Sequence, residues 1–208
     1  KVGEEFGFGD ATFTVLCPET DLVSSDDTND ASVGIKLVHG ENSFVMCGDA
    51  SEKSESAMVK RFGSALECDV LKCGHHGSRT STSEVFLKAT NPTWAVISCG
   101  VDNSYGHPHA EVLNRLRAAG VSVFRTDEQG TIVASSDGTT LTWNMSPSES
   151  WQAGEAKKSQ NTEKSEKAAD SQNNAETDAA VSNPTDQTDG NSDVIVHITK
   201  TGEKYHSA

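Results

Sequence analysis

Apolar residues along this chain occur in short runs that are separated either by turn residues or by amphipathic segments. Residues 11–16 and 32–38 alternate between apolar and polar positions, whereas residues 43–47 and 94–99 are almost continuously apolar. Alternation is typical of half-buried strands, and a continuous apolar run is typical of a strand that is buried on both faces. The same criteria predict further short strands at residues 70–73, 121–124, 131–134 and 140–143.

Between these strands lie segments whose apolar residues recur at helical spacing. They are residues 51–62, 83–89 and 110–119. In the last of them Val112, Leu113 and Leu116 share one face, and Gly120 follows as a helix stop signal. Strands that alternate with helices predict an α/β domain.

Three of the buried strands are followed closely by side chains that can bind a metal or transfer a proton. These side chains are Asp49 after the strand at 43–47, His75 and His76 after the strand at 70–73, and His107 and His109 in the loop after the strand at 94–99. Because loops at the same end of neighbouring strands in an α/β sheet converge, we expect these groups to meet although they lie far apart in sequence. A carboxylate together with imidazoles suits zinc or manganese, and such a metal with an open position can activate water.

Each of these residues also has a simpler interpretation. A helix is predicted just after Asp49, so this carboxylate could act only as an N-cap. Two adjacent histidines flanked by glycines could form a solvated turn. A catalytic zinc needs about three protein ligands, so either His107 or His109 completes the site or further ligands lie outside this chain.

The composition narrows the class of protein further. The chain has 208 residues, a formal net charge of -14 and a pI near 4.8, which argues against binding nucleic acid through its own basic surface. Basic residues that could still form a local rim are Lys72, Arg79, Lys88, Arg115, Arg117 and Arg125. No apolar run approaches the length of a bilayer-spanning helix. Five cysteines without CxxC spacing indicate neither a disulfide framework nor a zinc knuckle, and we interpret those in apolar runs as buried residues.

The chain divides into three parts by composition. Residues 1–145 contain the predicted strands and helices. Residues 146–193 are polar and acidic with few large apolar side chains, so they cannot bury enough surface to offset chain entropy and are predicted to be a disordered linker. Residues 194–208 turn apolar again, and we interpret them as the start of a small C-terminal module that is cut short at Ala208.

Four separated motifs within residues 7–143 resemble a known family. In order they are Gly48-Asp49-Ala50, the sequence DVLKCGHHGS at residues 69–78, Ile97-Ser98-Cys99-Gly100, and the sequence NSYGHPH at residues 103–109. These motifs, in this order, resemble those of hydrolases of the metallo-β-lactamase fold. The branch they resemble is the one that contains the hydrolase domain of the ComEC competence protein. The resemblance implies an αββα sandwich that holds one or two divalent metals, zinc or manganese, and hydrolyses a phosphodiester, with nucleic acid as a candidate substrate.

The resemblance also implies roles for individual residues. Asp49 and His75 match metal ligands of the family. The candidate catalytic residues beside the metal are His76, His107 and His109. The candidate substrate-binding residues are Asn29, Ser32, Ser78, Asn103 and Tyr105. Asn29 and Ser32 match the position where other branches carry a further metal-binding histidine.

One motif of the family, HxHxDH, does not occur in this sequence. In the family it lies upstream of the matched segment and supplies most metal ligands. We therefore expect residues 1–145 to be the C-terminal portion of the domain, with the N-terminal portion missing, and the chain alone to be inactive. The end of the chain is similar to the opening of a tail module in secreted relatives, which favours an extracellular or cell-surface location. The alternative is a non-catalytic extracellular binding or scaffold protein that keeps the fold.

Overall fold

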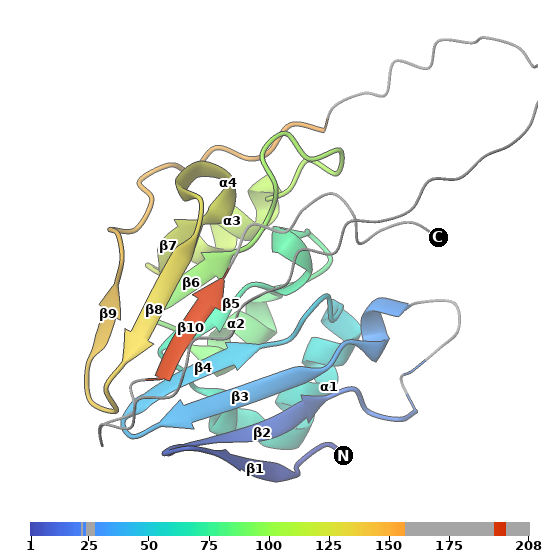
Figure 1. The fold of residues 1–208 in the computed structure, drawn as a ribbon. Helices are drawn as coiled ribbons and strands as arrows, with labels where there is room; N and C mark the ends of the chain where they lie inside the picture. The colour runs from blue at the N-terminus through green and yellow to red at the C-terminus, as the bar shows by residue number, and fades with distance from the viewer. Residues whose placement is uncertain (22, 24–27, 157–193, 199–208) are drawn as a thin grey trace, which may run out of the picture.

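The computed structural model of this protein describes residues 1–21, 23, 28–156 and 194–198, and its centre is a mixed seven-stranded sheet (Figure 1). The strands, in order across the sheet, are β1 (Glu5–Phe8), β2 (Ala11–Cys17), β3 (Gly34–His39), β4 (Asn42–Met46), β5 (Val70–Lys72), β6 (Trp94–Ile97) and β7 (Ser122–Arg125). Neighbours from β1 to β4 pair antiparallel, whereas β4 to β7 pair parallel. Parallel neighbours need crossover connections, and helices supply them here.

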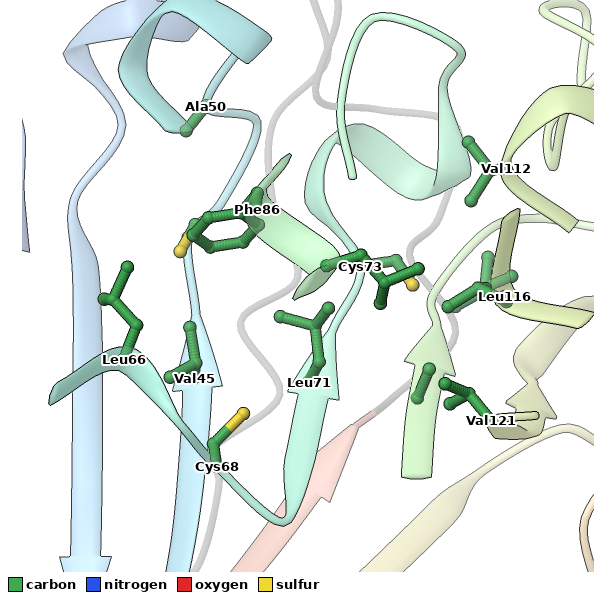
Figure 2. Packing of buried hydrophobic residues seen from close by; sticks show 14 of the residues in the cluster. Val45, Ala50, Leu66, Cys68, Leu71, Cys73, Phe86, Val112, Leu116 and Val121 are labelled. Atoms are coloured by element: carbon green, nitrogen blue, oxygen red, sulfur yellow. The ribbon is translucent and has the colours of Figure 1, made fainter. Parts of the chain in front are cut away.

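Helices α1 (Glu52–Phe62), α2 (Glu84–Thr90) and α3 (Ala110–Ala118) connect the parallel strands and pack on one face of the sheet. The hydroxyl of Ser51 caps α1 by accepting a hydrogen bond from the backbone N–H of Lys53. Figure 2 shows the core beneath the helices, which includes Val45, Leu71, Cys73, Phe86, Val112 and Leu116. Full burial of one such large side chain contributes about 1.5–3 kcal/mol, so this face provides much of the stability of the domain.

Alternate residues of the same strands point to the other face of the sheet. Phe44, Val70 and Phe124 pack there against Ile132 and Trp143, and the rings of Phe124 and Trp143 stack with centroids 4.0 Å apart. Ile132 and Trp143 belong to a second sheet of order β10-β8-β9, formed by β8 (Ile132–Ser136), β9 (Leu141–Trp143) and β10 (Val194–Ile198). The described part of the chain therefore has three layers: helices, the mixed sheet and the small sheet.

These elements confirm the predicted α/β class, and the three helices begin and end within one residue of the predicted bounds. The sequence did not predict β1, whose residues are all exposed, because an exposed edge strand needs no apolar pattern. It also did not predict α4 (Thr126–Gln129), which lies between the strands predicted at residues 121–124 and 131–134. No helix among the described residues is long and apolar enough to cross a membrane.

Two predictions concern the end of the chain. Strand β10 lies at the start of the segment predicted to begin a C-terminal module, and it pairs antiparallel with β8. Residues 199–208 of that segment and residues 157–193 of the predicted linker lie outside the described residues. The first part of the predicted linker, residues 146–156, lies against the domain.

Candidate active site

The loops that follow β4, β5 and β6 lie at one edge of the mixed sheet, because these strands are parallel neighbours. The ring centroid of His107 lies 5.7 Å from that of His75, 6.2 Å from that of His76 and 4.8 Å from that of His109. Asp49 reaches the same place, with Oδ1 3.4 Å from Nε2 of His76. The structure thus gathers the five side chains that the sequence placed after three separate strands.

The two adjacent histidines have a backbone conformation that non-glycine residues adopt rarely. His75 has φ 46° and ψ 47°, and His76 has φ 56° and ψ 23°, so both lie in the left-handed region. Such residues cost of order 1–3 kcal/mol each and cluster at functional sites. The turn is held by hydrogen bonds from the N–H of His75 to the carbonyl of Gly48 (3.0 Å) and from the N–H of Ser78 to the carbonyl of His75 (2.8 Å). The fold therefore maintains local strain where it presents both imidazoles.

The ring of His76 is oriented from both sides. Its Nδ1 lies 2.7 Å from the carbonyl oxygen of Ser98, and because a carbonyl can only accept, Nδ1 carries the proton. In the neutral ring Nε2 therefore carries a lone pair, and Nε2 donates a hydrogen bond to Asp49 only when the ring is protonated. The hydrogen bond with His76 lowers the pKa of the Asp49 carboxyl to about 2, although burial opposes it, and the same bond raises the pKa of His76. The sequence assigned metal binding to His75 and catalysis to His76, and the structure shows a direct contact with Asp49 for His76.

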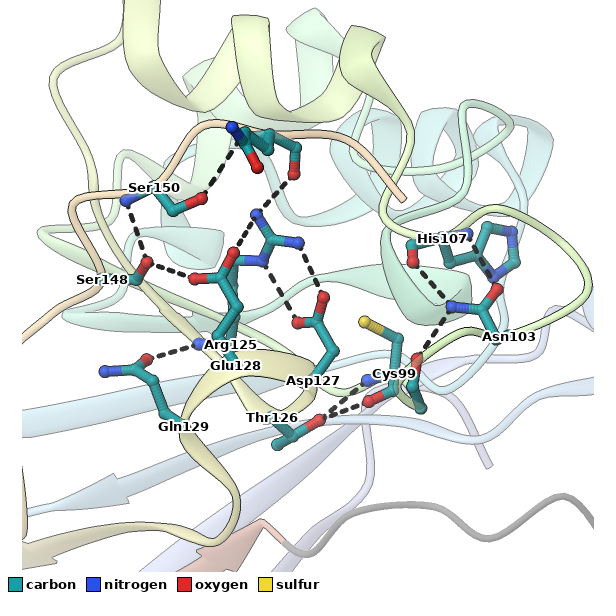
Figure 3. Close-up of polar contacts among 12 residues, drawn as sticks. Cys99, Asn103, His107, Arg125, Thr126, Asp127, Glu128, Gln129, Ser148 and Ser150 are labelled. Carbon is teal, nitrogen blue, oxygen red and sulfur yellow. Dashed lines mark hydrogen bonds and ion pairs between the residues drawn. The ribbon is translucent and has the colours of Figure 1, made fainter. Parts of the chain in front are cut away.

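A single amide side chain holds the loop that carries His107. Nδ2 of Asn103 donates to the carbonyls of Gly100 (2.9 Å) and His107 (2.7 Å), and its Oδ1 accepts from the N–H of His107 (2.9 Å), as Figure 3 shows. Tyr105 stacks on the imidazole of His107 with ring centroids 5.6 Å apart. Burial lowers the pKa of His107 to about 4, and the neighbouring histidines act in the same direction. His107 is therefore a neutral imidazole near pH 7.

His109 connects this loop to the histidine turn. Its Nδ1 accepts a hydrogen bond from the N–H of Arg79 (3.0 Å), and its own N–H donates to the carbonyl of Gly77 (2.9 Å). Burial lowers the pKa of His109 as well. Gly77 has a φ of +80°, and a Cβ there would lie 2.9 Å from Cβ of Pro108. Only glycine therefore allows the two loops to approach this closely.

The remaining predicted substrate-binding residues lie around Asp49 and the histidine turn. The hydroxyl of Ser32 accepts a hydrogen bond from the N–H of Asp49 (3.0 Å), so it fixes the backbone that carries the carboxylate. The carbonyl of Asn29 accepts from the N–H of Ser32 (3.0 Å). Ser78, the residue that follows the histidine turn, is buried. These contacts hold the backbone around Asp49 in place. Substrate binding by these residues stays a prediction.

Sequence analysis missed Asp30, which lies in a segment that its polar composition predicts to be an exposed loop. Asp30 is only 4% exposed, and its Oδ1 accepts hydrogen bonds from the hydroxyls of Ser51 (2.5 Å) and Ser54 (2.7 Å). These bonds tie the segment before Ser32 to the first turn of α1, the helix that follows Asp49. No local pattern signals this contact, because its partners lie more than twenty positions away in the chain.

We expect Asp30→Asn to lower the free energy of unfolding by roughly 1–3 kcal/mol near neutral pH, because an amide accepts these hydrogen bonds less strongly. Burial alone would raise the pKa of Asp30, but the bonds from Ser51 and Ser54 and the charge of Lys53 lower it below the ordinary 3.8. A lowered pKa contributes stability that is present above the unfolded-state value and is lost as the pH falls through the folded-state value.

Urea unfolding near neutral pH and again at about pH 2–3 checks this expectation. The difference between wild type and Asp30→Asn should shrink on acidification. An equal difference at both pH values would contradict the assigned role of the carboxylate.

The donor types at this edge of the sheet suit a divalent first-row metal, because carboxylate oxygen and neutral imidazole nitrogen are common ligands of such ions. A histidine whose Nδ1–H binds a backbone carbonyl, as in His76, is also the usual arrangement in metal sites. Within the part of the chain that the structure describes, however, no group of three or more His, Cys, Asp or Glu side chains could hold an ion. These residues therefore fit a metal as part of a ligand set rather than as a complete one.

Fold and site together define an α/β protein in which one carboxylate and a cluster of imidazoles meet at the ends of three parallel strands. The chain is similar to the competence protein ComA of Neisseria gonorrhoeae, with 42% identity over 106 residues, or 51% of this chain and 15% of that protein. It is 38% identical over 132 residues to ComE operon protein 3 of Bacillus subtilis, covering 64% of this chain and 17% of the relative. It is 35% identical over 130 residues to recombination protein 2 of Haemophilus influenzae, covering 62% of this chain and 16% of that protein.

The matched part of this chain spans about one sixth of the length of these curated relatives. A scan against models of known protein families finds no match.

Proposed function

We propose that this domain is part of a metal-dependent phosphodiesterase of the metallo-β-lactamase type, with nucleic acid as its substrate class. The observation that carries the proposal is the meeting of Asp49 with four imidazoles at the ends of β4, β5 and β6. The similarity to proteins named for competence and recombination supports the substrate class, because both processes act on DNA.

Asp49 and His75, with His76 beside them, would hold one or two zinc or manganese ions. Bound there, the metal would lower the pKa of a coordinated water and so supply the nucleophile for hydrolysis. His76 keeps Nε2 directed at Asp49 through its hydrogen bond to Ser98. Because burial lowers the pKa of His107 to about 4, its ring is neutral near pH 7 and offers a nitrogen lone pair as a hydrogen-bond acceptor.

A complete site needs more ligands than the described residues bring together. We propose that the other ligands belong to a part of the protein outside this chain, which agrees with the short share of the relatives that it covers. A metallo-β-lactamase sandwich would supply them from its other half. The order of the helices, the mixed sheet and the small sheet supports this proposal, because it corresponds to three of the four layers of an αββα sandwich.

The acidic balance of the chain limits how a nucleic acid could bind. A net charge of -14 repels a polyanion over most of the surface. We propose that Lys72, just before the histidine turn, and Arg79, just after it, provide local positive charge for a phosphate group. The sequence analysis included Arg125 in this basic rim. The structure shows that this was wrong, because Arg125 is buried and paired with Asp127. An extracellular or cell-surface location is part of the proposal and rests on the tail sequence alone.

The test uses a form of the protein that includes the segment upstream of Lys1, which we call the extended form. Hydrolysis of bis(p-nitrophenyl) phosphate and of single-stranded DNA is measured after treatment with EDTA and again after addition of zinc or manganese. We expect chelation to reduce the rate at least ~100-fold and one of the two metals to restore it. Absence of both bound metal and hydrolysis would favour the alternative, a non-catalytic binding or scaffold protein.

A further inference from the structure

Residues 146–156, which the sequence assigned to the linker, run from β9 across β7 to the candidate active site. We call this segment the strap. Figure 3 shows part of it above the buried guanidinium of Arg125, with the His107 loop nearby. The strap is polar and has no helix or strand of its own beyond a single bridge.

Hydrogen bonds fix the first half of the strap to β7 and α4. Ser148 forms an isolated bridge with Val123, and its N–H donates to the carbonyl of Val123 (2.7 Å). The hydroxyl of Ser148 donates to Oε2 of Glu128 (2.6 Å). Nε2 of Gln129 donates to the carbonyl of Ser146 (2.8 Å). The path of the strap is thus set by specific contacts soon after it leaves β9.

Trp151 and Arg125 fix the middle of the strap. Trp151 packs on the core beneath the helices, and the guanidinium of Arg117 lies 5.8 Å from its ring centroid. Arg125 donates from Nη1 to the carbonyl of Gln152 (2.7 Å), while Nη2 donates to Asp127 (2.7 Å). A buried, paired cation therefore holds the strap just before it reaches the loop.

The end of the strap meets the backbone of the His107 loop with no side chain between them. The N–H of Gly154 donates to the carbonyl of Pro108 (2.9 Å). A Cβ on Gly154 would overlap the carbonyl oxygen of His107, and a Cβ on Gly106 would lie 2.9 Å from the nitrogen of Ala156. Two glycines, one in each segment, therefore permit this contact.

We infer that the strap is a positioning element of the active site and that Gly154 is a positioning residue, which acts on the reaction only through His107. The inference rests on the proposed hydrolase function. Asn103, which belongs to the loop that carries His107, binds the carbonyl of His107. The strap binds the same loop one residue later, at the carbonyl of Pro108. Because a displacement of about 1 Å in a catalytic group can cost roughly 100-fold in rate, a loop held from both sides favours turnover.

Gly154→Ala in the 208-residue chain tests this hold without an activity assay. The added methyl would push the strap away from the loop, and we expect amide hydrogen exchange at His107 and His109 to accelerate at least ~10-fold. Both amides are hydrogen-bonded within the site, so their exchange reports its opening. Gly7→Ala is the matched control and should change neither rate, because a Cβ there meets no atom within 4 Å.

A second variant, Trp151→Ala, releases the middle of the strap without touching the loop. It should accelerate exchange at the same two amides. In the extended form, Gly154→Ala should lower kcat about 10-fold and change KM less than about twofold, because the loop is misplaced while substrate binding is kept.

The outcomes separate this inference from the proposed function. Exchange at wild-type rates in both Gly154→Ala and Trp151→Ala would overturn the inference, even in a protein that hydrolyses phosphodiesters. Faster exchange in Gly154→Ala without hydrolysis by the wild-type extended form would support the hold of the strap on the loop and refute the proposed function.

Discussion

Replacing Arg125 with alanine is expected to lower the free energy of unfolding by about 3–5 kcal/mol. The guanidinium is almost completely buried and binds both carboxylate oxygens of Asp127, at 3.2 and 2.7 Å, and one of Glu128, at 2.9 Å. Truncation would leave these carboxylates without a cation and the carbonyl of Gln152 without its donor. Breaking a buried pair in this way costs more than the pair itself contributes. Urea unfolding followed by circular dichroism measures the loss.

Two further variants separate charge pairing from general loss of packing. Arg117→Ala removes a cation that lies over the Trp151 ring at the surface and should cost only about 0.5–1 kcal/mol. The double variant Arg125→Met/Asp127→Leu should recover much of the loss, because apolar replacement of a buried ion pair is often nearly neutral. A loss below about 1 kcal/mol in Arg125→Ala would mean that the pairing does not stabilise the fold.

The parallel part of the sheet could be predicted because each strand is an apolar run between a turn and a helix. A strand buried on both faces requires such a run, as Val45 and Phe44 in β4 illustrate by packing into opposite cores. Helical crossovers make the strands parallel, so their ends lie at one edge of the sheet. The meeting of Asp49 with histidines far away in sequence follows from this topology.

The contacts that surround these side chains could not be predicted, because they come from segments without a periodic pattern. Asp30 is buried only because two serines of α1 face it. The strap has the composition of a linker, and its position depends on one tryptophan and on the carbonyl of Gln152. The sequence did contain a signal that Arg125 is buried and ion-paired, since Asp127 and Glu128 follow it closely at the end of a buried strand. Local composition does not otherwise report contacts between distant backbone and side-chain groups.

Asp49→Asn is expected to reduce phosphodiester hydrolysis by the extended form at least about 100-fold while the fold is retained. The amide has nearly the shape of the carboxylate but carries no charge to bind a cation or to pair with His76, 3.4 Å away. The hydrogen bond from the backbone N–H of Asp49 to Ser32 does not involve the side chain, so the loop should keep its position. Metal content measured by mass spectrometry should fall with the rate, and the far-ultraviolet circular dichroism should not change.

The control is Glu41→Gln, which makes the same carboxylate-to-amide change on an exposed residue just before β4, at the opposite end of that strand from Asp49. Its turnover should stay within about twofold of wild type. His75→Ala and His76→Ala are then compared for bound metal, and His76→Ala also removes the side chain that contacts Asp49. The histidine variant that loses more metal identifies the ligand. If Asp49→Asn keeps both its metal and its turnover, the carboxylate of Asp49 has no part in the reaction, and the hydrolase site must lie elsewhere in the protein.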